Sequence, residues 1–451
     1  MHLAKSLTLA ATLASPLSFR KFHRYLPPEW VNNALESTGT ATIRERRLPA
    51  ERVVWLIIAM GLFRDRPIVD LVDQLGIALP KSNSLSVASS AVTQARYRIG
   101  EKPLEYLFRK SAEKWSAQSA GRHLFRGLSL YGMDGSLLRI PDSARNREHF
   151  GGPTGGKVRG VGAYPMVRLV ALMALRSHVV GAARLTPYKV AEMTSAKEMC
   201  PSIPDDSLTI FDRGFLGAGL LIPMARDKRN RHWLTRAKST TKWTVEKKLG
   251  SGDDLVSMKV SDQARKADES LPARWLVRAI RYQRPGYGPQ MLLTSLLDPK
   301  KYPPEELREL YHERWELELG FDEVKTEMLD REEAIRSQLP AGVNQEIWGL
   351  LLAYNLVRLE IESIADEEKI PPIRISFAGV FREIRDEVNW LDGIRPSVIV
   401  DRLRKMRARI KRRHILPPRR HERKYPRAVK VKISSYPKKR PPPSPTETSP
   451  K

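Results

Sequence analysis

The sequence predicts a mixed α/β fold in which a central sheet is preceded and followed by helices. Three observations support this prediction. Apolar residues recur at helical spacing before Asp134, short runs typical of strands occur from Leu128 to about residue 300, and helical spacing returns from Glu305. The 451 residues are enough for two or three domains around one sizeable core.

The first part of the chain predicts a helical domain over residues 1–120. Its candidate helices are Pro28 to Ser37, Ala50 to Leu62, Pro67 to Leu75, Ser89 to Ile99 and Pro103 to Trp115. The fourth has a Ser cap, an exposed Gln and two Arg residues, which suits a recognition helix in a nucleic-acid groove. An ordinary amphipathic helix packed in a bundle explains the same pattern.

The predicted sheet begins with Leu128 to Ser136, a short apolar run that contains Asp134 and Gly135. We interpret this run as a strand that delivers Asp134 near its end, where a glycine lets another group come close. The alternative is that the Asp-Gly dipeptide forms a hairpin turn.

A second acid follows the run Ser207 to Phe211, which is rich in strand-forming residues. This run ends in Asp212, an arginine and a glycine. The neighbouring Asp205 and Asp206 lie before the strand, in a loop. The alternative role for Asp212 is to cap the next helix, predicted from Ala218 to Arg226.

Two further strands, Tyr164 to Arg176 and His178 to Leu185, and a helix near Ala191 to Met199 lie between the two acids. The predicted order is a three-stranded meander, a helix and a further strand. A β-rich insertion is predicted at about residues 228–300 from runs of alternating residues. These runs are His232 to Arg236, Trp243 to Val245, Leu255 to Val260, Trp275 to Tyr282 and Met291 to Ser295.

Four polar residues share one face of the helix predicted from Glu305 to Met328. At about 100° per residue they fall within an arc of roughly 60°, beside a stripe of apolar residues that would face a core. They are Tyr311, Arg314, Glu318 and Lys325. The alternative is a charged, solvated face, and Asp322 is a rival acid on nearly the same side of the helix.

The conjunction of these motifs resembles the insertion-sequence transposases of the DDE class that carry a YREK signature. The tetrad matches that signature, the residues from Leu138 to Asp142 resemble those after the family's first acid, and Asp212-Arg213-Gly214 followed by an aromatic resembles the second acid motif. The likeness covers roughly Leu26 to Ile364. It implies an RNase H-like catalytic core over residues 121–340, with the β-rich insertion inside it and a helical DNA-binding domain before it.

The resemblance also implies roles for single residues. Asp134, Asp212 and Glu318 would be catalytic and would hold two Mg²⁺ ions, for which Mn²⁺ can substitute; Asp134 would touch both metals. Hard cations of this kind prefer carboxylate oxygens, and they neutralise charge that develops on an attacked phosphodiester. Tyr311, Arg314 and Lys325 would bind DNA phosphates. The implied reaction is cut-and-paste transposition, in which element ends are cleaved and joined to target DNA.

The C-terminal part predicts helices at Asn344 to Ile364 and Phe377 to Trp390, in a region over residues 341–416. In related transposases this region helps to pair two protomers on DNA, which implies a homodimer in the DNA complex. The alternative is that these helices only cover one face of the core. Residues 417–451 predict a disordered basic tail rich in proline.

The charge of the chain favours a polyanionic partner. Lys and Arg number 78 against 51 Asp and Glu, a formal charge of +27. From Asp401 to Lys451 there are 19 basic residues and three acids. Double-stranded DNA, at element ends and at the target, is therefore the expected partner.

Several other classes of protein are excluded by the sequence. The single cysteine, Cys200, excludes an intramolecular disulfide. No apolar run approaches the roughly 20 residues of a membrane span. Met1 to Ser18 resembles a weak signal peptide, but Thr and Ser interrupt its apolar run, so we expect no signal peptide. The segment Gly151 to Lys157 fits part of a P-loop, but Val158 replaces the Ser or Thr that would hold Mg²⁺. We therefore expect no nucleotide cofactor, and a cytoplasmic, nucleoid-associated protein.

Two alternatives to a transposase remain open from the sequence. One is a metal-dependent nuclease with the same fold, which would cut DNA without joining the ends. The other is a catalytically inactive regulator that only holds DNA ends.

Overall fold

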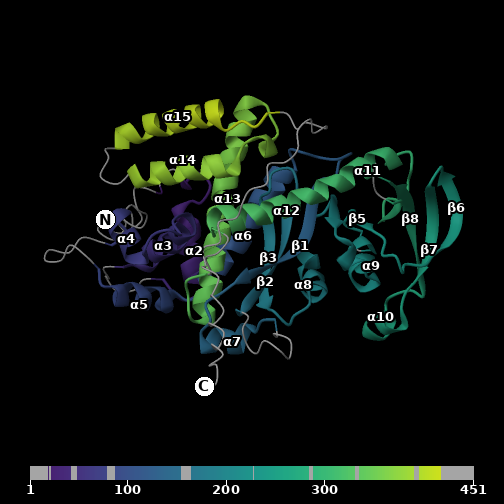
Figure 1. Cartoon of the computed structure of the whole chain (residues 1–451), viewed down its shortest axis with the longest axis horizontal. Coiled ribbons are helices and arrows are strands. Elements are labelled where there is room, and N and C mark those ends of the chain that lie inside the picture. Colours follow the sequence, from purple (N-terminus) through teal and green to yellow (C-terminus); the bar gives the residue numbers. More distant parts are fainter. Residues whose placement is uncertain are drawn as a thin grey trace, which may run out of the picture. The chain divides into compact units, whose positions relative to one another are not determined.

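The computed structural model describes residues 19, 22–41, 48–78, 87–153, 164–226, 228–283, 288–330, 335–390 and 396–417. These residues form a mixed α/β structure with one sheet of nine strands (Figure 1). The predicted fold class is confirmed. The signal-like segment, most of the P-loop-like segment and nearly all of the predicted basic tail lie outside the described residues. None of the described helices is long and apolar enough to cross a membrane.

The N-terminal region is helical, as predicted. Its helices are α2 (Pro28–Ser37), α3 (Ala50–Leu62), α4 (Ile68–Gln74), α5 (Ser89–Ile99) and α6 (Lys102–Ala120). Helix α3 is buried on every side, because α13 (Pro340–Glu368) crosses it closely: a Cβ on Gly349 would lie 2.5 Å from Ile57 Cγ2. No side chain caps α5, so the expected Ser cap is absent.

The centre of the sheet has the strand order of an RNase H-like core. Its elements are β1 (Ser129–Arg139), β2 (Met166–Ala174), β3 (Val180–Pro187), α8 (Glu192–Met199), β4 (Ser207–Phe211) and β5 (Arg231–Arg236). β2 lies antiparallel between β1 and β3, whereas β4 runs parallel to β1 and β5 runs parallel to β4. The short helix α7 (Ala144–Phe150) follows β1, and α9 (Ala218–Arg226) follows β4.

β1 is longer than the sequence predicted, because Gly135 to Arg139 continue to pair with β2. Asp134 therefore lies within the strand rather than near its end, and the hairpin-turn alternative for Asp134 and Gly135 is wrong. The parallel pairing of β1 with β4 stops at Met133 and Phe211. Asp134 is thus the first residue of β1 beyond the end of β4.

The remaining strands extend the same sheet. They are β6 (Thr244–Gly250), β7 (Asp253–Lys259), β8 (Arg274–Tyr282) and β9 (Gln290–Thr294), with α10 (Asp262–Ala267) between β7 and β8. β9 pairs with β5, so the β-rich residues continue the core sheet in the order β3-β2-β1-β4-β5-β9-β8-β7-β6. The run from His232 to Arg236 is β5 and belongs to the centre of this sheet.

The segment predicted as one regular helix from Glu305 to Met328 changes its winding along its length. α11 (Pro304–Tyr311) passes into a 3₁₀ turn (His312–Arg314), then into α12 (Trp315–Asp322) and finally into a π-helical turn (Glu323–Met328). The expectation of uniform helical spacing is therefore wrong over part of the segment. The directions of the four polar residues depend on these changes of winding.

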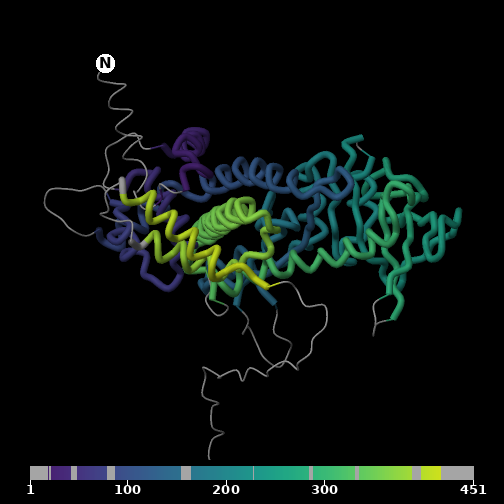
Figure 2. Tube along the Cα trace, turned by 90° about the horizontal axis from the view of Figure 1, so that it is seen from above, coloured from purple at the N-terminus to yellow at the C-terminus, as the bar shows by residue number. Residues whose placement is uncertain are grey.

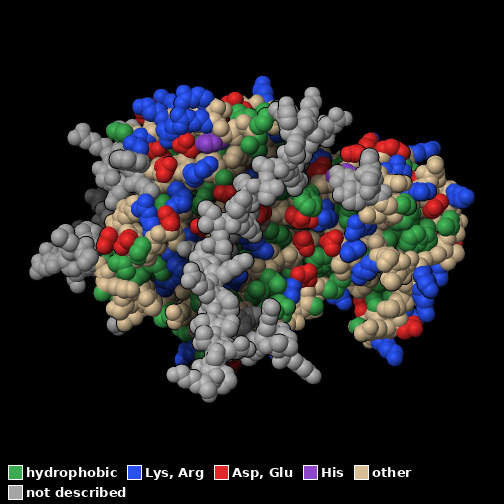
Figure 3. Space-filling view, in the orientation of Figure 1, with side chains coloured by type: hydrophobic (Ala, Val, Ile, Leu, Met, Phe, Trp, Pro, Cys, Tyr) green, Lys and Arg blue, Asp and Glu red, His purple; other side chains and the backbone are tan. Residues whose placement is uncertain are grey.

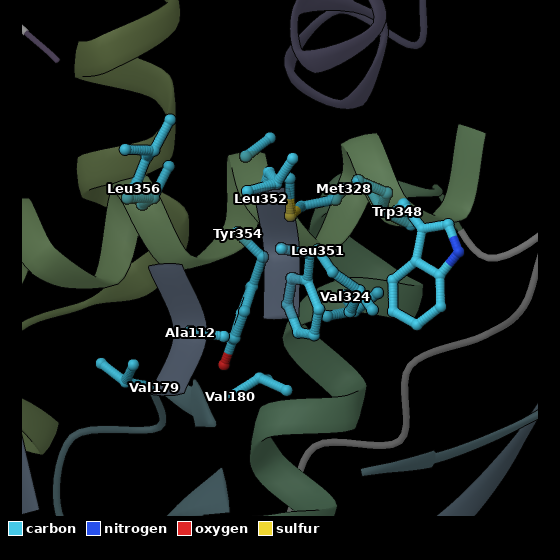
Figure 4. Packing of buried hydrophobic residues seen from close by; sticks show 14 of the residues in the cluster. Ala112, Val179, Val180, Val324, Met328, Trp348, Leu351, Leu352, Tyr354 and Leu356 are labelled. Carbon is cyan, nitrogen blue, oxygen red and sulfur yellow. The ribbon is translucent and has the colours of Figure 1, made fainter. Parts of the chain in front are cut away.

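Helix α13 runs through the core and meets both the N-terminal helices and the sheet. Figure 4 shows its Trp348, Leu351 and Leu352 with Val324 and Met328 of the π turn, all in one apolar cluster. α14 (Phe377–Trp390) and α15 (Pro396–Arg413) follow it. Figure 2 shows the C-terminal helices at the same end of the molecule as the N-terminal ones. The candidate site therefore lies on a sheet that is braced from both ends of the sequence.

Candidate active site

The register of β1 and β4 brings Asp134 and Asp212 next to one another. Met133 lies opposite Phe211, so the following position on each chain is an aspartate. Neighbouring strands lie about 4.8 Å apart. Asp212 Oδ2 accepts a hydrogen bond of 3.3 Å from the backbone N–H of Gly214, at the start of a 3₁₀ turn. It caps this short turn and not α9, which was the predicted alternative.

Asp134 carries negative charge that its surroundings compensate only in part. Burial raises the pKa of its carboxyl to about 6, and the charges of Glu192 and Asp212 add to that rise. The N–H of Gly135, 2.7 Å from Asp134 Oδ1, and the charge of Arg314 act in the opposite direction. A group whose charge is disfavoured in this way is a common mark of a functional site.

Close packing holds the helical segment against the strands that carry the aspartates. Gly132 of β1 has no side chain, and a Cβ there would lie 2.5 Å from Leu317 Cδ1 of α12. Likewise a Cβ on Gly320 would lie 2.6 Å from Met173 Cε of β2. These glycines allow helix and sheet to approach closely. Glu318 follows Leu317 on this closely packed helix, and its side chain pairs with Arg314.

Arg314 links the third acid to the two aspartates. It donates a hydrogen bond of 2.8 Å to Glu318 Oε1, and its charge acts on Asp134. Burial raises the pKa of Tyr311, which lies within the electrostatic reach of both Arg314 and Asp212. The structure thus groups Tyr311, Arg314 and Glu318 around the end of β4.

Lys325 approaches the same group from the π turn. Burial lowers its pKa, and the charges of Asp322 and Asp134 oppose that change. The rival acid Asp322 is exposed and accepts a hydrogen bond of 2.6 Å from Thr326 in the next turn. The positive charges of Arg314 and Lys325 therefore both act on Asp134.

The described residues contain no group of three or more His, Cys, Asp or Glu side chains already placed to hold a metal ion. Glu318 is paired with Arg314 instead. The donor chemistry still fits Mg²⁺, because carboxylate oxygens are the ligands that hard cations prefer and Asp134 has excess negative charge around it. The side chain of Glu318 is 38% exposed, which leaves it free to exchange Arg314 for a cation.

One carboxylate near the site was missed in the sequence. Glu192, in the first turn of α8, lies over Gly135: a Cβ on that glycine would be 2.6 Å from Glu192 Cδ. Arg168 of β2 forms an ion pair with Glu192. The only signal in the sequence was an acid at the start of the helix predicted between the third and fourth strands.

The predicted recognition helix presents a mixed surface. Arg96 of α5 is buried and donates hydrogen bonds to Gln345 and Ser337, at 3.1 and 2.8 Å. Gln94 and Tyr97 of the same helix are exposed. One of the two arginines noted in the sequence therefore holds the helix in place, and the outward face is formed by other side chains.

Two protein families match this chain. Residues 16–109 match the family described as "Insertion element 4 transposase N-terminal", and residues 127–356 match "Transposase DDE domain". The second match spans all six site residues proposed from the sequence. It also spans β1 to β9 and most of α13.

One curated relative covers nearly the whole chain, and another covers half of it. The chain is 36% identical over 441 residues to "Transposase InsG for insertion sequence element IS4" of Escherichia coli (strain K12), covering 97% of this chain and 98% of that protein. It is 38% identical over 226 residues to "Putative transposase InsZ" of the same organism, covering 50% of this chain and 74% of that protein.

A solved structure titled "Cryo-EM structure of piggyBac transposase synaptic complex with hairpin DNA (SNHP)" aligns with 91% of this chain and 86% of its own, at 12% identity and a TM-score of 0.39. Similarity at that level supports no inference, and the assignment rests on the family matches and the curated relatives. The chain belongs to the insertion element 4 family of DDE transposases, which catalyse phosphoryl transfer on DNA.

Proposed function

We propose that this transposase is a member of the YREK-signature subgroup and moves its element by cleavage at the ends and strand transfer into target DNA. Asp134, Asp212 and Glu318 are its catalytic carboxylates. The observation that carries this proposal is the register of β1 and β4, which sets two aspartates side by side where the parallel pairing ends. Glu318 would reach the same place because α12, which carries it, packs on β1 through Leu317 and Gly132.

These three carboxylates would hold two Mg²⁺ ions, with Mn²⁺ as a substitute. When bound, such ions neutralise charge on the attacked phosphodiester and lower the pKa of bound water. The protein itself supplies a rigid arrangement: Asp134 is fixed in the middle of a strand, and Asp212 is fixed by its cap on the following turn. Metal binding would relieve the unfavourable charge on Asp134.

Tyr311, Arg314 and Lys325 would bind the phosphates on either side of the cut. Arg314 has a second role in the protein without DNA, because its guanidinium neutralises Glu318. When Glu318 turns to the metal, the guanidinium becomes available to a phosphate, which it can bind through two parallel hydrogen bonds. Arg314 would thereby prevent repulsion between carboxylates until DNA and metal arrive.

Other regions would bind double-stranded DNA and a second protomer. We assign element-end binding to residues 1–120, with the exposed face of α5 in a groove. Lys and Arg side chains gather over α15 (Figure 3), where Arg404, Lys405 and Arg412 are exposed; this face suits DNA phosphates. The helices of residues 341–416 would pair two protomers on DNA. The protein would act in the cytoplasm, where the nucleoid lies.

The deciding experiment incubates the purified protein with Mg²⁺ and the DNA that flanks its own reading frame. Joined products support cut-and-paste transposition. Cuts without joining would support the nuclease, and a mobility shift without cuts would support the inactive regulator. Glu318→Gln should abolish cleavage and leave end binding largely intact. Equal cleavage by this variant would remove Glu318 from the site.

A further inference from the structure

A set of buried charges on the inner side of the catalytic helical segment has no part in the proposed chemistry. We propose that the turn between β2 and β3, together with Arg358 and Tyr354 of α13, clamps residues 312–328 and fixes the register in which Glu318 and Lys325 face the aspartates. The residues of this clamp are positioning residues. The inference rests on the proposed function, because it assigns them to the same site.

Three acids of the helical segment face inward, one in each type of winding. Glu313 lies in the 3₁₀ turn, Glu316 in α12 and Glu323 at the start of the π turn. Each of the three has a basic or imidazole partner on the sheet side. They alternate along the chain with Arg314, Glu318 and Lys325. Holding the inward acids in place therefore also sets the directions of these outward side chains.

The first clamp contact joins the 3₁₀ turn to the sheet. Arg176 donates two hydrogen bonds to Glu313, from Nε to Oε2 at 2.9 Å and from a terminal nitrogen to Oε1 at 2.7 Å. A bidentate pair of this kind fixes direction as well as distance. Glu313 directly precedes Arg314 in the sequence. Its pairing with Arg176 therefore limits the directions in which the Arg314 side chain can point.

The second contact uses a histidine in an unusual backbone conformation. His178 has a φ of 63°, a left-handed conformation that costs energy for most side chains. Its Nε2 lies 3.0 Å from Glu316 Oε2, and its Nδ1 lies 2.6 Å from the Arg358 guanidinium. Its Nδ1 also lies 3.4 Å from Glu323 Oε2, so that His178 contacts two of the three inward acids.

The third contact holds the start of the π turn. Glu323 forms an ion pair with the fully buried Arg358 and accepts a hydrogen bond of 2.8 Å from the Tyr354 hydroxyl. Burial alone would raise the pKa of Glu323, but the nearby Arg358 lowers it overall. A π turn holds an extra residue; such turns are rare and frequently lie at functional sites. Anchoring Glu323 therefore sets where Lys325 points.

The clamp can be tested by exchanging the charges of its most accessible pair. The side chains of Arg176 and Glu313 are 31% and 29% exposed, so substitutions there should be tolerated by the fold. Arg176→Glu and Glu313→Arg are each compared with the double exchange and with Glu305→Gln. Glu305 is a matched control on the same helical segment, because among the described residues its ion pair is with Arg308 of α11. His178→Asn is a further variant, since Asn tolerates a left-handed backbone.

Two measurements separate the clamp from the proposed function. Single-turnover cleavage at saturating DNA should fall at least about tenfold in each single exchange and in His178→Asn, with end affinity and melting temperature near those of the wild type. Amide hydrogen exchange of residues 312–328 should rise in the same variants. The double exchange should restore both the cleavage rate and the protection from hydrogen exchange. Glu305→Gln should change neither quantity.

The inference would be overturned if the single exchanges cleave at the wild-type rate, or if the double exchange is no better than either single variant. Hydrogen exchange does not depend on catalysis. If the wild-type protein fails to cleave, the proposed function fails while hydrogen exchange still tests the clamp. Raised exchange with unchanged cleavage would leave the clamp a structural feature only.

Discussion

Two carboxylates, the buried Glu346 and the half-buried Asp134, have opposite electrostatic surroundings. Burial would raise the pKa of Glu346 in α13, but Arg64, Arg96 and Arg336 surround it and lower the pKa overall. Burial raises the pKa of Asp134 to about 6, and neighbouring acids add to the rise. The charge of Glu346, which joins helices, is neutralised by arginines, whereas Asp134 of the candidate site keeps excess negative charge around it. That difference supports the proposed catalytic role of Asp134, which would come at a cost in stability.

The largest expected effect of breaking this contrast is on catalysis. Asp134→Asn should reduce Mg²⁺-dependent cleavage by on the order of 10³-fold or more, because a catalytic ligand is lost, while end binding remains. Glu346→Gln should cleave at close to the wild-type rate at temperatures where it is folded. The measurement is single-turnover cleavage of labelled element ends. Comparable losses in both variants would contradict the contrast.

The next effect is on stability. Glu346→Gln should lower the free energy of unfolding by about 3–5 kcal/mol, because three arginines would lose the charge that compensates them. Denaturant unfolding with a buffer that contains no DNA measures this change. A loss under about 1 kcal/mol would show that the ion pairs of Glu346 contribute little to the packing of α3, α5 and α13 against one another.

Asp134→Asn should have the opposite effect on stability in metal-free buffer. The folded pKa of about 6 lies above the ordinary 3.8, so the fold loses stability as pH rises between these values. Removing the charge should therefore stabilise the protein at pH 7, by about 1–2 kcal/mol after allowance for partial exposure. The advantage of the variant should vanish below pH 4. A destabilised variant at pH 7 would show that the Asp134 charge is compensated after all.

The smallest effect sharpens the role of the acid that the sequence did not reveal. Glu192→Gln removes one charge that raises the pKa of Asp134, so the acid limb of the cleavage rate should move to lower pH. The shift should stay under about one unit, since burial is the larger cause and remains. Glu198→Gln, on the same helix, is the control because Glu198 pairs with Arg184 instead. An acid limb that stays in place would separate Glu192 from Asp134.

Local patterns were sufficient for most of the fold. The spacing of apolar residues located α2, α3 and α5 almost to the residue, and the apolar runs located β1 and β4. The motif around each acid was recognised by its resemblance to a transposase family, although Asp134 lies within its strand and not at the end. The prediction that Asp134 and Asp212 belong together needed the further idea that both strands lie in one sheet.

The rest depended on contacts between distant residues. Asp134 lies within its strand because β2 continues to pair beyond it, and strand length is set by that partner. The acids of the 3₁₀ turn, α12 and the π turn pair with Arg176, His178 and Arg358, none of which lies in the helical segment itself. The approach of Glu192 to Gly135 likewise joins two elements. Such pairings leave no local pattern to read.

The most direct test of the account is a structure of the protein with Mn²⁺ and element-end DNA, in which anomalous scattering locates the metal. The account predicts Mn²⁺ bound by Asp134, Asp212 and Glu318, with Arg314 released from Glu318. Metal bound elsewhere, or these three carboxylates ordered and still apart around a metal-free site, would contradict it.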